Sequence, residues 1–272
     1  WGAPNQFFQG SCTVQAYRTT AGVQGSAVLW YPGSFAPFHL GHLNCLTLAQ
    51  SVTCAYGLRR AARQELEKQG IKVAGAYAKP QLQKSLSYKN LDNQSAILSS
   101  GNVRLRLMEL ILQQEDGIMA DPYAIMRNSG NNFVDLRSFR ANLTAAVTRM
   151  EGSGRADWAS SLEIIWVIGD DAFSHFKDKL LDRPAAPKDD ALKQVGPFRM
   201  CVVHNRPGQW TALGSRVDQL PFPVLEVTAP PELSPDLSAT AVRKQWQSGA
   251  SVEELAKLLG STAAASYMVS LR

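Results

Sequence analysis

Residues 28–42 constrain the fold of this 272-residue chain more than any other stretch. A continuously apolar run over 27–31 predicts a strand buried on both faces, and a Gly-Ser turn at Gly33 and Ser34 ends it. An H-x-G-H element follows at 39–42, and a helical pattern begins at Leu43. A glycine turn between a strand and a helix leaves backbone N–H groups unpaired and directed at one spot. Two histidines there add donors for phosphoryl oxygens, so we predict a triphosphate site.

The remainder of the chain alternates predicted strands with predicted helices. The further strands are expected at 71–76, 118–120, 163–168, 198–204 and 224–228. The helices are expected from Leu43 to Val52, at 58–69 with Gly70 as C-cap, at 103–114, 136–150 and 238–247, and after a capping box at Ser251 and Glu254. This alternation, without hairpin signals, predicts an α/β fold with a doubly wound parallel sheet and C-terminal helices. We expect one domain over 27–272, preceded by an N-terminal arm at 1–26.

Composition narrows the function classes. The net charge of +5 comes from scattered Lys and Arg residues, which suits polyphosphate binding in one pocket better than nucleic-acid binding. No apolar stretch is long enough to cross a bilayer, so no membrane association is expected. The four cysteines have no metal-ligand spacing and predict buried free thiols, hence an intracellular protein, cytoplasmic or nuclear. The first residue is Trp1, so a removed leader stays open.

Polar clusters follow several predicted strands. They are Gly33 with Ser34, Tyr77, the segment 169–171, and Asn205 with Arg206. Because the carboxyl ends of parallel strands lie at one edge of the sheet, these clusters are expected to line one crevice. The polar stretch 81–101 reads as a long loop, which we expect to close over bound substrate.

One segment carries a family resemblance. It resembles the signature of the H-x-G-H nucleotidylyltransferase superfamily and reads Gly33-Ser34-Phe35-x-Pro37-x-His39-x-Gly41-His42. The resemblance implies a Rossmann-like nucleotidylyltransferase fold and catalytic roles for His39 and His42. It also implies that Gly33, Ser34, Phe35 and Gly41 belong to the ATP site. The alternative is a strand, turn and helix with two structural histidines.

A second segment, Leu-Ser-Ala-Thr-Ala-Val-Arg at 237–243, is similar to the I-S-S-T-x-x-R element of the mononucleotide adenylyltransferase branch. The similarity implies that Ser238 and Thr240 bind ATP at a helix start and that Arg243 is catalytic. Ala239 replaces the second serine of the element. The alternative is an ordinary capped helix with a solvated arginine.

Weaker resemblances concern the nucleotide sugars and the acceptor. Gly169-Asp170-Asp171 resembles the G-x-D element that binds ribose hydroxyls, and the resemblance assigns Gly169 and Asp171 to the ATP site. The alternative for this segment is a helix start with Asp170 as the N-cap. The residues assigned to the mononucleotide are Tyr77 and Lys79, from an A-Y-x-K stretch, and Arg206, which follows the fifth predicted strand. Tyr123 is assigned as the aromatic side chain that stacks on the pyridine ring, and Trp210 is the other candidate for that role. For either aromatic, the alternative is a buried position in the core. Arg104 and Glu109 match the family's next helix, without separating structure from function.

Together these resemblances imply an adenylyltransferase that joins AMP from ATP to nicotinamide or nicotinate mononucleotide. The products would be NAD or its deamido form and pyrophosphate, with Mg²⁺ bridging the phosphates and no metal ligands from the protein. The alternatives are a pantetheine-phosphate adenylyltransferase, a cytidylyltransferase, or a non-catalytic nucleotide-binding regulator. Ala239, Gly75 in place of an acidic residue, and the missing stacking tryptophan keep the last alternative open. Formation of a homo-oligomer is also left open.

Overall fold

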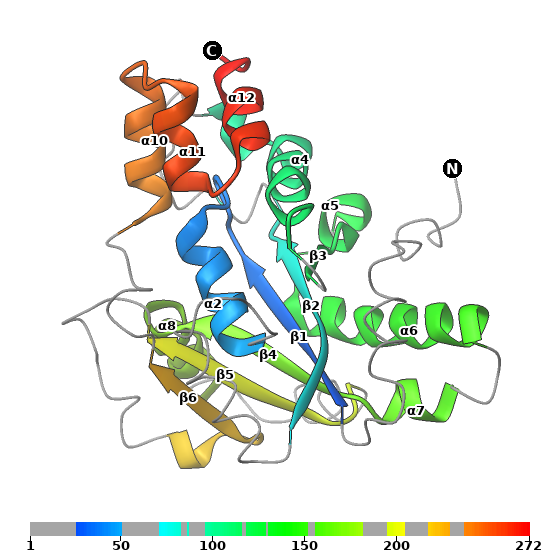
Figure 1. Cartoon of the computed structure of the whole chain (residues 1–272). Coiled ribbons are helices and arrows are strands. Elements are labelled where there is room, and N and C mark those ends of the chain that lie inside the picture. Colours follow the sequence, from blue (N-terminus) through cyan, green and yellow to red (C-terminus); the bar gives the residue numbers. More distant parts are fainter. Residues whose placement is uncertain are drawn as a thin grey trace.

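Six parallel strands form one sheet in the order β3-β2-β1-β4-β5-β6 (Figure 1). This computed structural model describes residues 26–50, 71–82, 86, 96–115, 118–128, 130–151, 156–181, 195–204, 217–228 and 237–272. The strands are β1 (Ser26–Gly33), β2 (Lys72–Pro80), β3 (Ile118–Ala120), β4 (Glu163–Gly169), β5 (Phe198–His204) and β6 (Val224–Thr228). The helices are α2 (Leu40–Gln50), α4 (Gly101–Leu112), α5 (Tyr123–Arg127), α6 (Asn132–Glu151), α7 (Ala156–Ser161), α8 (Asp170–Leu181), α10 (Ala239–Gln247), α11 (Val252–Leu259) and α12 (Thr262–Val269), with 3₁₀ turns at Ala96–Ser99 and Val217–Gln219.

The strand order is that of a doubly wound sheet. The chain moves outward from β1 through β2 to β3, then returns to the other side of β1 and moves outward through β4, β5 and β6. The connection reverses between β1 and β4, and in such sheets the ligand crevice lies beyond the carboxyl ends of the strands at that reversal. The predicted α/β class with a parallel sheet is confirmed.

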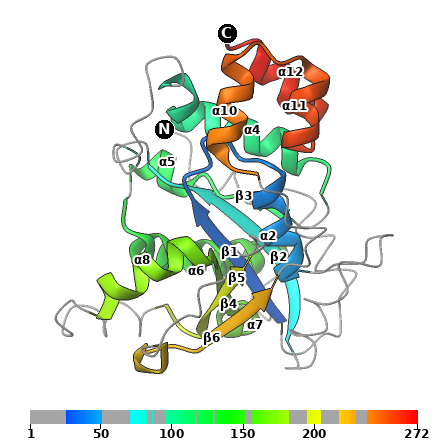
Figure 2. The same ribbon diagram turned by 90° about the vertical axis from the view of Figure 1, so that its left-hand side faces the viewer.

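Helices cover both faces of this sheet (Figure 2). On one face, Ala27, Leu29 and Tyr31 of β1 pack in a core with α2, α4 and the three C-terminal helices. On the other face, Val28 and Trp30 pack in a core with α6, α7 and α8. Because successive side chains of a strand point to opposite faces, the apolar run at 27–31 supplies both cores at once.

The three C-terminal helices form a layer of their own at the end of the molecule where the C-terminus lies (Figure 1). The predicted capping box at Ser251 and Glu254 is present at the start of α11. The indole Nε1 of Trp246 donates to the carbonyl oxygen of Met268 at 2.7 Å, which joins α10 to α12. Ser261 Oγ donates to the carbonyl oxygen of Leu110 at 3.0 Å and so joins this layer to α4.

The bounds of several elements differ from those predicted. Strands β3, β5 and β6 match, but β2 continues to Pro80, so Tyr77 and Lys79 lie inside the strand and do not follow it. Helix α2 begins at Leu40, before the predicted Leu43. Helix α6 begins at Asn132, also earlier than predicted, and α5, α7, α8 and α12 were not predicted. Ser26, predicted as the end of the arm at 1–26, is the first residue of β1, and the predicted loop at 81–101 contains the 3₁₀ turn Ala96–Ser99 and the first residue of α4. Residues 1–25 of the arm, the helix at 58–69 with Gly70, and residues 83–85 and 87–95 of the loop lie outside the described residues.

Two of the four cysteines fall within the described part of the chain. Cys45 and Cys201 are buried free thiols, as predicted, whereas Cys12 and Cys54 lie outside the described residues. Burial raises the pKa of the Cys201 thiol to about 12, because a thiolate loses its hydration in the core.

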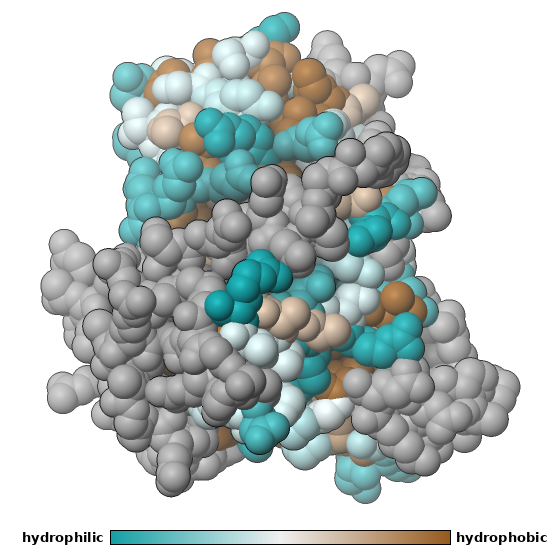
Figure 3. All heavy atoms as spheres, turned by 90° about the vertical axis from the view of Figure 1, so that its right-hand side faces the viewer, coloured by the Kyte–Doolittle hydropathy of each residue, from teal (hydrophilic) through white to brown (hydrophobic). Residues whose placement is uncertain are grey.

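None of the described helices combines the length and apolarity that crossing a bilayer needs. On the face shown in Figure 3, hydrophobic and hydrophilic residues are mixed at the top of the molecule, where α10, α11 and α12 lie.

Candidate active site

The H-x-G-H element forms the first turn of α2. The Nδ1 atom of His39 accepts a hydrogen bond from the N–H of Gly41 at 3.1 Å. In return, His42 Nδ1 accepts from the N–H of His39 at 3.3 Å. His39 is at the N-cap and His42 at the third helical position, as Ser and Glu are in a capping box, except that the N-cap side chain here accepts from the N–H of the second helical residue, Gly41. The two histidines therefore begin the helix themselves, which is why α2 starts at Leu40.

These two hydrogen bonds fix the roles of the ring nitrogens. In each imidazole Nδ1 is the acceptor, so the ring proton is assigned to Nε2, which is then the donor nitrogen. The rings of His39 and His42 lie close together, with centroids 3.8 Å apart. His39 is 3% exposed, and the His42 ring packs against Phe35 and Phe38. The arrangement holds two N–H donors at the positive end of the α2 dipole, where an anion is favoured.

Close packing explains the glycines of this turn. Phe35 adopts a left-handed backbone with φ of 47° and turns its buried ring over Gly33. A Cβ atom on Gly33 would lie 2.4 Å from Cε1 of that ring. A Cβ atom on Gly41 would lie 3.0 Å from Cε1 of His39. A side chain at either position would displace Phe35 or a histidine, so both glycines are required by the shape of the turn.

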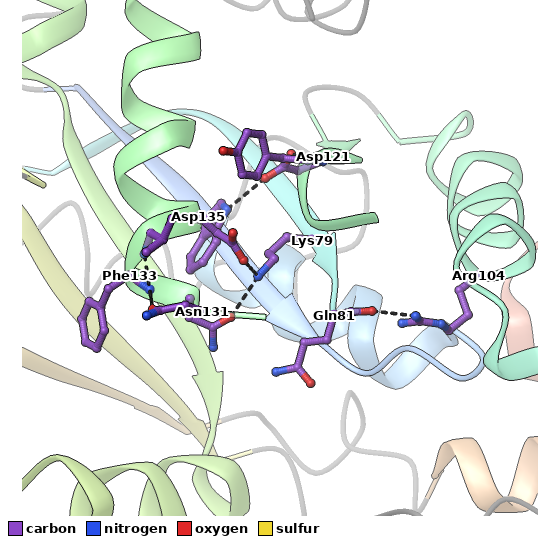
Figure 4. Close-up of polar contacts among 11 residues, drawn as sticks. Lys79, Gln81, Arg104, Asp121, Asn131, Phe133 and Asp135 are labelled. Carbon is purple, nitrogen blue, oxygen red and sulfur yellow. Dashed lines mark hydrogen bonds and ion pairs between the residues drawn. The ribbon is translucent and has the colours of Figure 1, made fainter. Parts of the chain in front are cut away.

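A buried arginine holds the turn after β1 to its neighbours. Arg104 of α4 donates from Nη1 to the carbonyl oxygen of Ser34 at 2.7 Å, from Nη2 to that of Gln81 at 2.6 Å, and from Nε to that of Ser99 at 3.0 Å. The Gln81 contact is drawn in Figure 4. Arg104 is fully buried, and this burial lowers the pKa of its guanidinium to about 10. The guanidinium thus satisfies carbonyl groups that the strand ends and the turn leave unpaired.

The C-terminal motif lies against the same turn. Arg243 Nη1 donates to the carbonyl oxygen of Ala36 at 2.7 Å, and its Nη2 donates to Thr240 Oγ1 at 2.9 Å. Ser238 is the N-cap of α10, as predicted, since its Oγ accepts from the N–H of Ala241 at 3.1 Å. The carbonyl oxygen of Leu237 would lie 3.5 Å from a Cβ atom on Gly41. The structure therefore brings the first and last motifs together, with the N-termini of α2 and α10 next to one another.

The end of β4 adds two carboxylates. Helix α8 begins at Asp170, directly after Gly169, and the exposed Asp171 accepts from the N–H of Ala172 through Oδ1 at 2.7 Å. Asp170 is buried and is the first residue of α8, so it does not occupy the N-cap position that was its alternative; its Oδ1 accepts from the N–H of Asp171 at 2.8 Å. A Cβ atom on Gly169 would lie 3.1 Å from Asp171 Oδ1. Asp171 thus stands at the carboxyl edge of the central strand pair, directly after β4.

The residues assigned to the mononucleotide are placed differently. Tyr77 is 2% exposed and packs its ring against Phe139 in the core under α6. Tyr123 is half-buried at the first position of α5, where its N–H donates to Asp121 Oδ1 at 3.0 Å. Arg206 and Trp210 lie outside the described residues. Of the assigned set, Tyr123 is therefore the described aromatic that combines partial exposure with the carboxyl edge of the sheet.

Lys79 is buried in an ionic cluster between β2 and α6 (Figure 4). Its ammonium donates to Asp135 Oδ2 and, at 2.9 Å, to Asn132 Oδ1, and it lies 5.3 Å from the ring centroid of Trp30. Burial lowers the pKa of Lys79, and the attraction of Asp135 opposes that change. Asp121, which accepts from Trp30 Nε1 at 3.2 Å, has its pKa raised by burial. Lys79 thus joins a strand to a helix from inside the protein, whereas the sequence assigned it to a ligand.

Three features of this region were not assigned a role from the sequence. They are the bonding of Arg104 to three carbonyl groups, the partner of Lys79, and a contact of Asp170 with His204. Arg104 and Ser34 are 70 residues apart, Lys79 and Asp135 are 56 apart, and Asp170 and His204 are 34 apart. A polar residue that directly follows an apolar run, such as Lys79 after 73–78 or His204 after 200–203, is the local signal that could have indicated a buried partner.

The described residues do not supply a metal centre. No group of three or more His, Cys, Asp and Glu side chains within them is arranged to hold a metal ion.

Comparison with known proteins finds solved structures whose backbone is similar to that of this chain. No protein-family model matches the sequence, and a search of curated proteins gives no match. A structure of Plasmodium falciparum nicotinic acid mononucleotide adenylyltransferase complexed with APC matches with a TM-score of 0.49 and 9% identity, over 91% of this chain and 96% of that chain. A structure of that enzyme complexed with NaAD matches with a TM-score of 0.49 and 10% identity, over the same shares of both chains. The fold assigned above rests on the strand order and not on these values.

Proposed function

We propose that this protein is an adenylyltransferase that joins AMP from ATP to nicotinamide or nicotinate mononucleotide. The observation that carries the proposal is the contact between the two motifs, in which Arg243 reaches the backbone of Ala36 beside the histidine turn. Two helix N-termini, two imidazole donors and a guanidinium then lie around one position, a set of groups suited to a polyphosphate. The comparison structures are consistent with this assignment, although it does not depend on them.

The reaction needs alignment and charge stabilisation more than covalent help. A phosphate oxygen of the mononucleotide attacks the α-phosphorus of ATP, and the bond from that phosphorus to the bridging oxygen breaks as pyrophosphate leaves. The attacking phosphate is already ionised near neutral pH, so no general base is required. His39 and His42 would donate from Nε2 to phosphate oxygens on which charge develops, and Arg243 would bind the departing pyrophosphate.

The remaining assigned residues would hold the two substrates. Gly33, Ser34, Phe35 and Gly41 shape the turn, while Ser238 and Thr240 present the start of α10 to the triphosphate. Asp171 would accept hydrogen bonds from ribose hydroxyls. Tyr123 would stack on the pyridine ring at the end of β3. The negative charge of the triphosphate would be reduced by Mg²⁺ supplied with ATP, while His39, His42 and Arg243 would face the phosphates from the protein.

The test is a product assay with purified protein, ATP and Mg²⁺, run separately with each mononucleotide. We expect a dinucleotide and an equal amount of pyrophosphate with at least one acceptor. Folded protein that forms neither product would overturn the proposal. Parallel reactions with phosphopantetheine, and with CTP in place of ATP, separate the other enzymes of this type. ATP binding by calorimetry without pyrophosphate release would identify a nucleotide-binding regulator instead.

A further inference from the structure

The ring of His204 lies between two carboxylates at the carboxyl edge of the sheet. His204 is the last residue of β5 and is 3% exposed. Its Nδ1 lies 3.2 Å from Asp170 Oδ2, and its Nε2 lies 3.3 Å from Glu226 Oε2. The contacts connect the start of α8, the end of β5 and the middle of β6. This unit took no part in the site as predicted from the sequence.

Strand geometry directs these side chains to the same side. His204 alternates with Met200 and Val202 along β5, and these two residues pack in the core beneath α8. Glu226 pairs with Val202 in the parallel register of β5 and β6. Since residues two apart in a strand share a face, His204 and Glu226 both point to the face of the sheet covered by α8, whose first residue is Asp170.

The chemistry of the unit is restricted by its proton count. A neutral imidazole has a single N–H, whereas both of its nitrogens here face carboxylate oxygens. A neutral ring can donate to one of the two carboxylates, and a protonated ring can donate to both. Such charge-assisted bonds hold a side chain in one position more firmly than neutral bonds do.

The unit ends one residue from the nucleotide site. Asp170 uses Oδ2 for His204 and Oδ1 to accept from the N–H of Asp171 at 2.8 Å. Asp171 is exposed in the first turn of α8, where its carboxylate is assigned to the ribose. An apolar residue at position 204 would fill the space as well, but it would leave the buried Asp170 carboxylate without its ring donor.

We propose that His204 is a positioning residue for nucleotide binding, which holds Asp170 and through it the first turn of α8 so that Asp171 is set toward the ribose of ATP. The inference rests on the proposed function, because that function gives Asp171 its ligand. The contact of Nδ1 with Asp170 is the one that positions Asp171, and the contact of Nε2 with Glu226 orients the ring.

A matched pair of variants tests which ring nitrogen matters. The amide nitrogen of asparagine lies near the position of Nδ1, and that of glutamine lies near the position of Nε2. His204→Asn therefore keeps a donor for Asp170, whereas His204→Gln keeps a donor only for Glu226. We expect H204Q to raise the KM and the calorimetric Kd for ATP about tenfold, with kcat within about twofold, and H204N to stay within about threefold of the wild type.

Asp170→Ala gives an independent measurement. It should raise the Kd for ATP by a similar factor, and the double variant H204Q/D170A should lose no more than either single variant, because both changes interrupt one connection. Equal ATP binding in H204N, H204Q and the wild type would overturn the inference. Additive losses in the double variant, or losses that follow the thermal unfolding midpoints of the variants, would overturn it as well.

The outcome can be separated from the proposed function. If the wild type binds ATP but forms no dinucleotide, the proposed reaction is wrong and the Kd values still decide the role of His204. If the wild type forms dinucleotide while H204Q binds ATP normally, the reaction stands and the positioning role fails. A wild type that does not bind ATP would overturn both.

Discussion

Arg243 Nη1 lies 2.7 Å from the carbonyl oxygen of Ala36, a residue 207 positions earlier in the chain. The same guanidinium bonds Thr240 Oγ1 from Nη2, so the arginine is held on its own helix and against the turn after β1. This contact makes the two motifs parts of one site. It also means that Arg243 needs little rearrangement to face a phosphate bound at that turn.

Arg243→Ala should lower kcat for dinucleotide formation by about 10²–10³-fold, because the departing pyrophosphate loses a preorganised cation. Its free energy of unfolding should fall by about 1 kcal/mol, the value of the lost hydrogen bonds at a half-buried position. R243K should recover only part of kcat, since an ammonium lacks the planar pair of donors. Steady-state kinetics and urea unfolding measure the two effects. Arg106→Ala, at an exposed position of α4, is the matched control, and a similar loss of activity there would contradict the assignment.

Arg104→Met should unfold more easily than the wild type by about 3 kcal/mol or more. The substitution leaves the carbonyl groups of Ser34, Gln81 and Ser99 without their donor inside the protein. R104K should also be destabilised, because one ammonium cannot reach three carbonyl groups that a guanidinium spans. Urea unfolding at neutral pH measures the effect, again with R106A as control. Stability equal to that of R106A would show that these hydrogen bonds do not hold the turn.

The Lys79 and Asp135 pair predicts a strong coupling. Lys79→Met alone should cost about 3–5 kcal/mol, because it leaves the buried Asp135 carboxylate without its cation. The double variant K79M/D135L should recover much of that loss, since two apolar side chains need no desolvated charge. A double-mutant cycle from urea unfolding gives the coupling energy. Additive losses in the double variant would contradict a buried pair and return Lys79 to the ligand role predicted from sequence.

The sequence predicted the sheet well because its strands are buried. The runs at 27–31, 164–168 and 200–203 are apolar throughout, which is the pattern of a strand covered on both faces. Strand β2 was predicted to end at Ala76 because Tyr77 and Lys79 were assigned to a ligand site beyond the strand, whereas the strand continues to Pro80. The partner of Lys79, Asp135, is 56 residues away, and a single charge in a strand gives no hint of where its counter-charge lies.

Two helix starts in the C-terminal part of the chain were predicted from serine caps, although α12, which Ser261 caps, was not predicted. Ser238 and Ser251 cap α10 and α11 as expected. Helix α2 was placed three residues late because its capping groups are imidazoles, which sequence rules do not count as caps. In the site, the motifs and their order along the chain were predictable, whereas Arg104 and His204 were not, because their roles depend on carbonyl and carboxylate groups from other elements.

Stability at alkaline pH should report on Cys201. The pKa of its thiol is raised from 9.0 to about 12 in the folded protein, so between these values the unfolded chain has lost a proton that the folded protein keeps. This contribution to stability is complete below about pH 9 and is lost as pH rises toward 12, with a slope of at most about 1.4 kcal/mol per pH unit. The difference in unfolding free energy between C201V and the wild type should therefore grow from pH 8 to pH 10 in favour of the variant. A constant difference across this range would contradict a buried, protonated thiol.

The two functions of His42 can be separated by substitution. His42 Nδ1 accepts the N–H of His39 in the first turn of α2, while Nε2 is the donor assigned to phosphate. Asparagine places an oxygen near Nδ1 and nothing near Nε2, so H42N should keep the helix cap, whereas H42A should lose about 1 kcal/mol of stability as well.

Both variants should bind ATP and turn over about 10²–10³-fold more slowly than the wild type, because transition-state charge on the phosphate loses a donor. Kinetics with calorimetric ATP binding and urea unfolding distinguish the two losses. An H42N variant with wild-type turnover would mean that the histidine only caps the helix. The catalytic centre would then have to lie elsewhere along the carboxyl edge of the sheet.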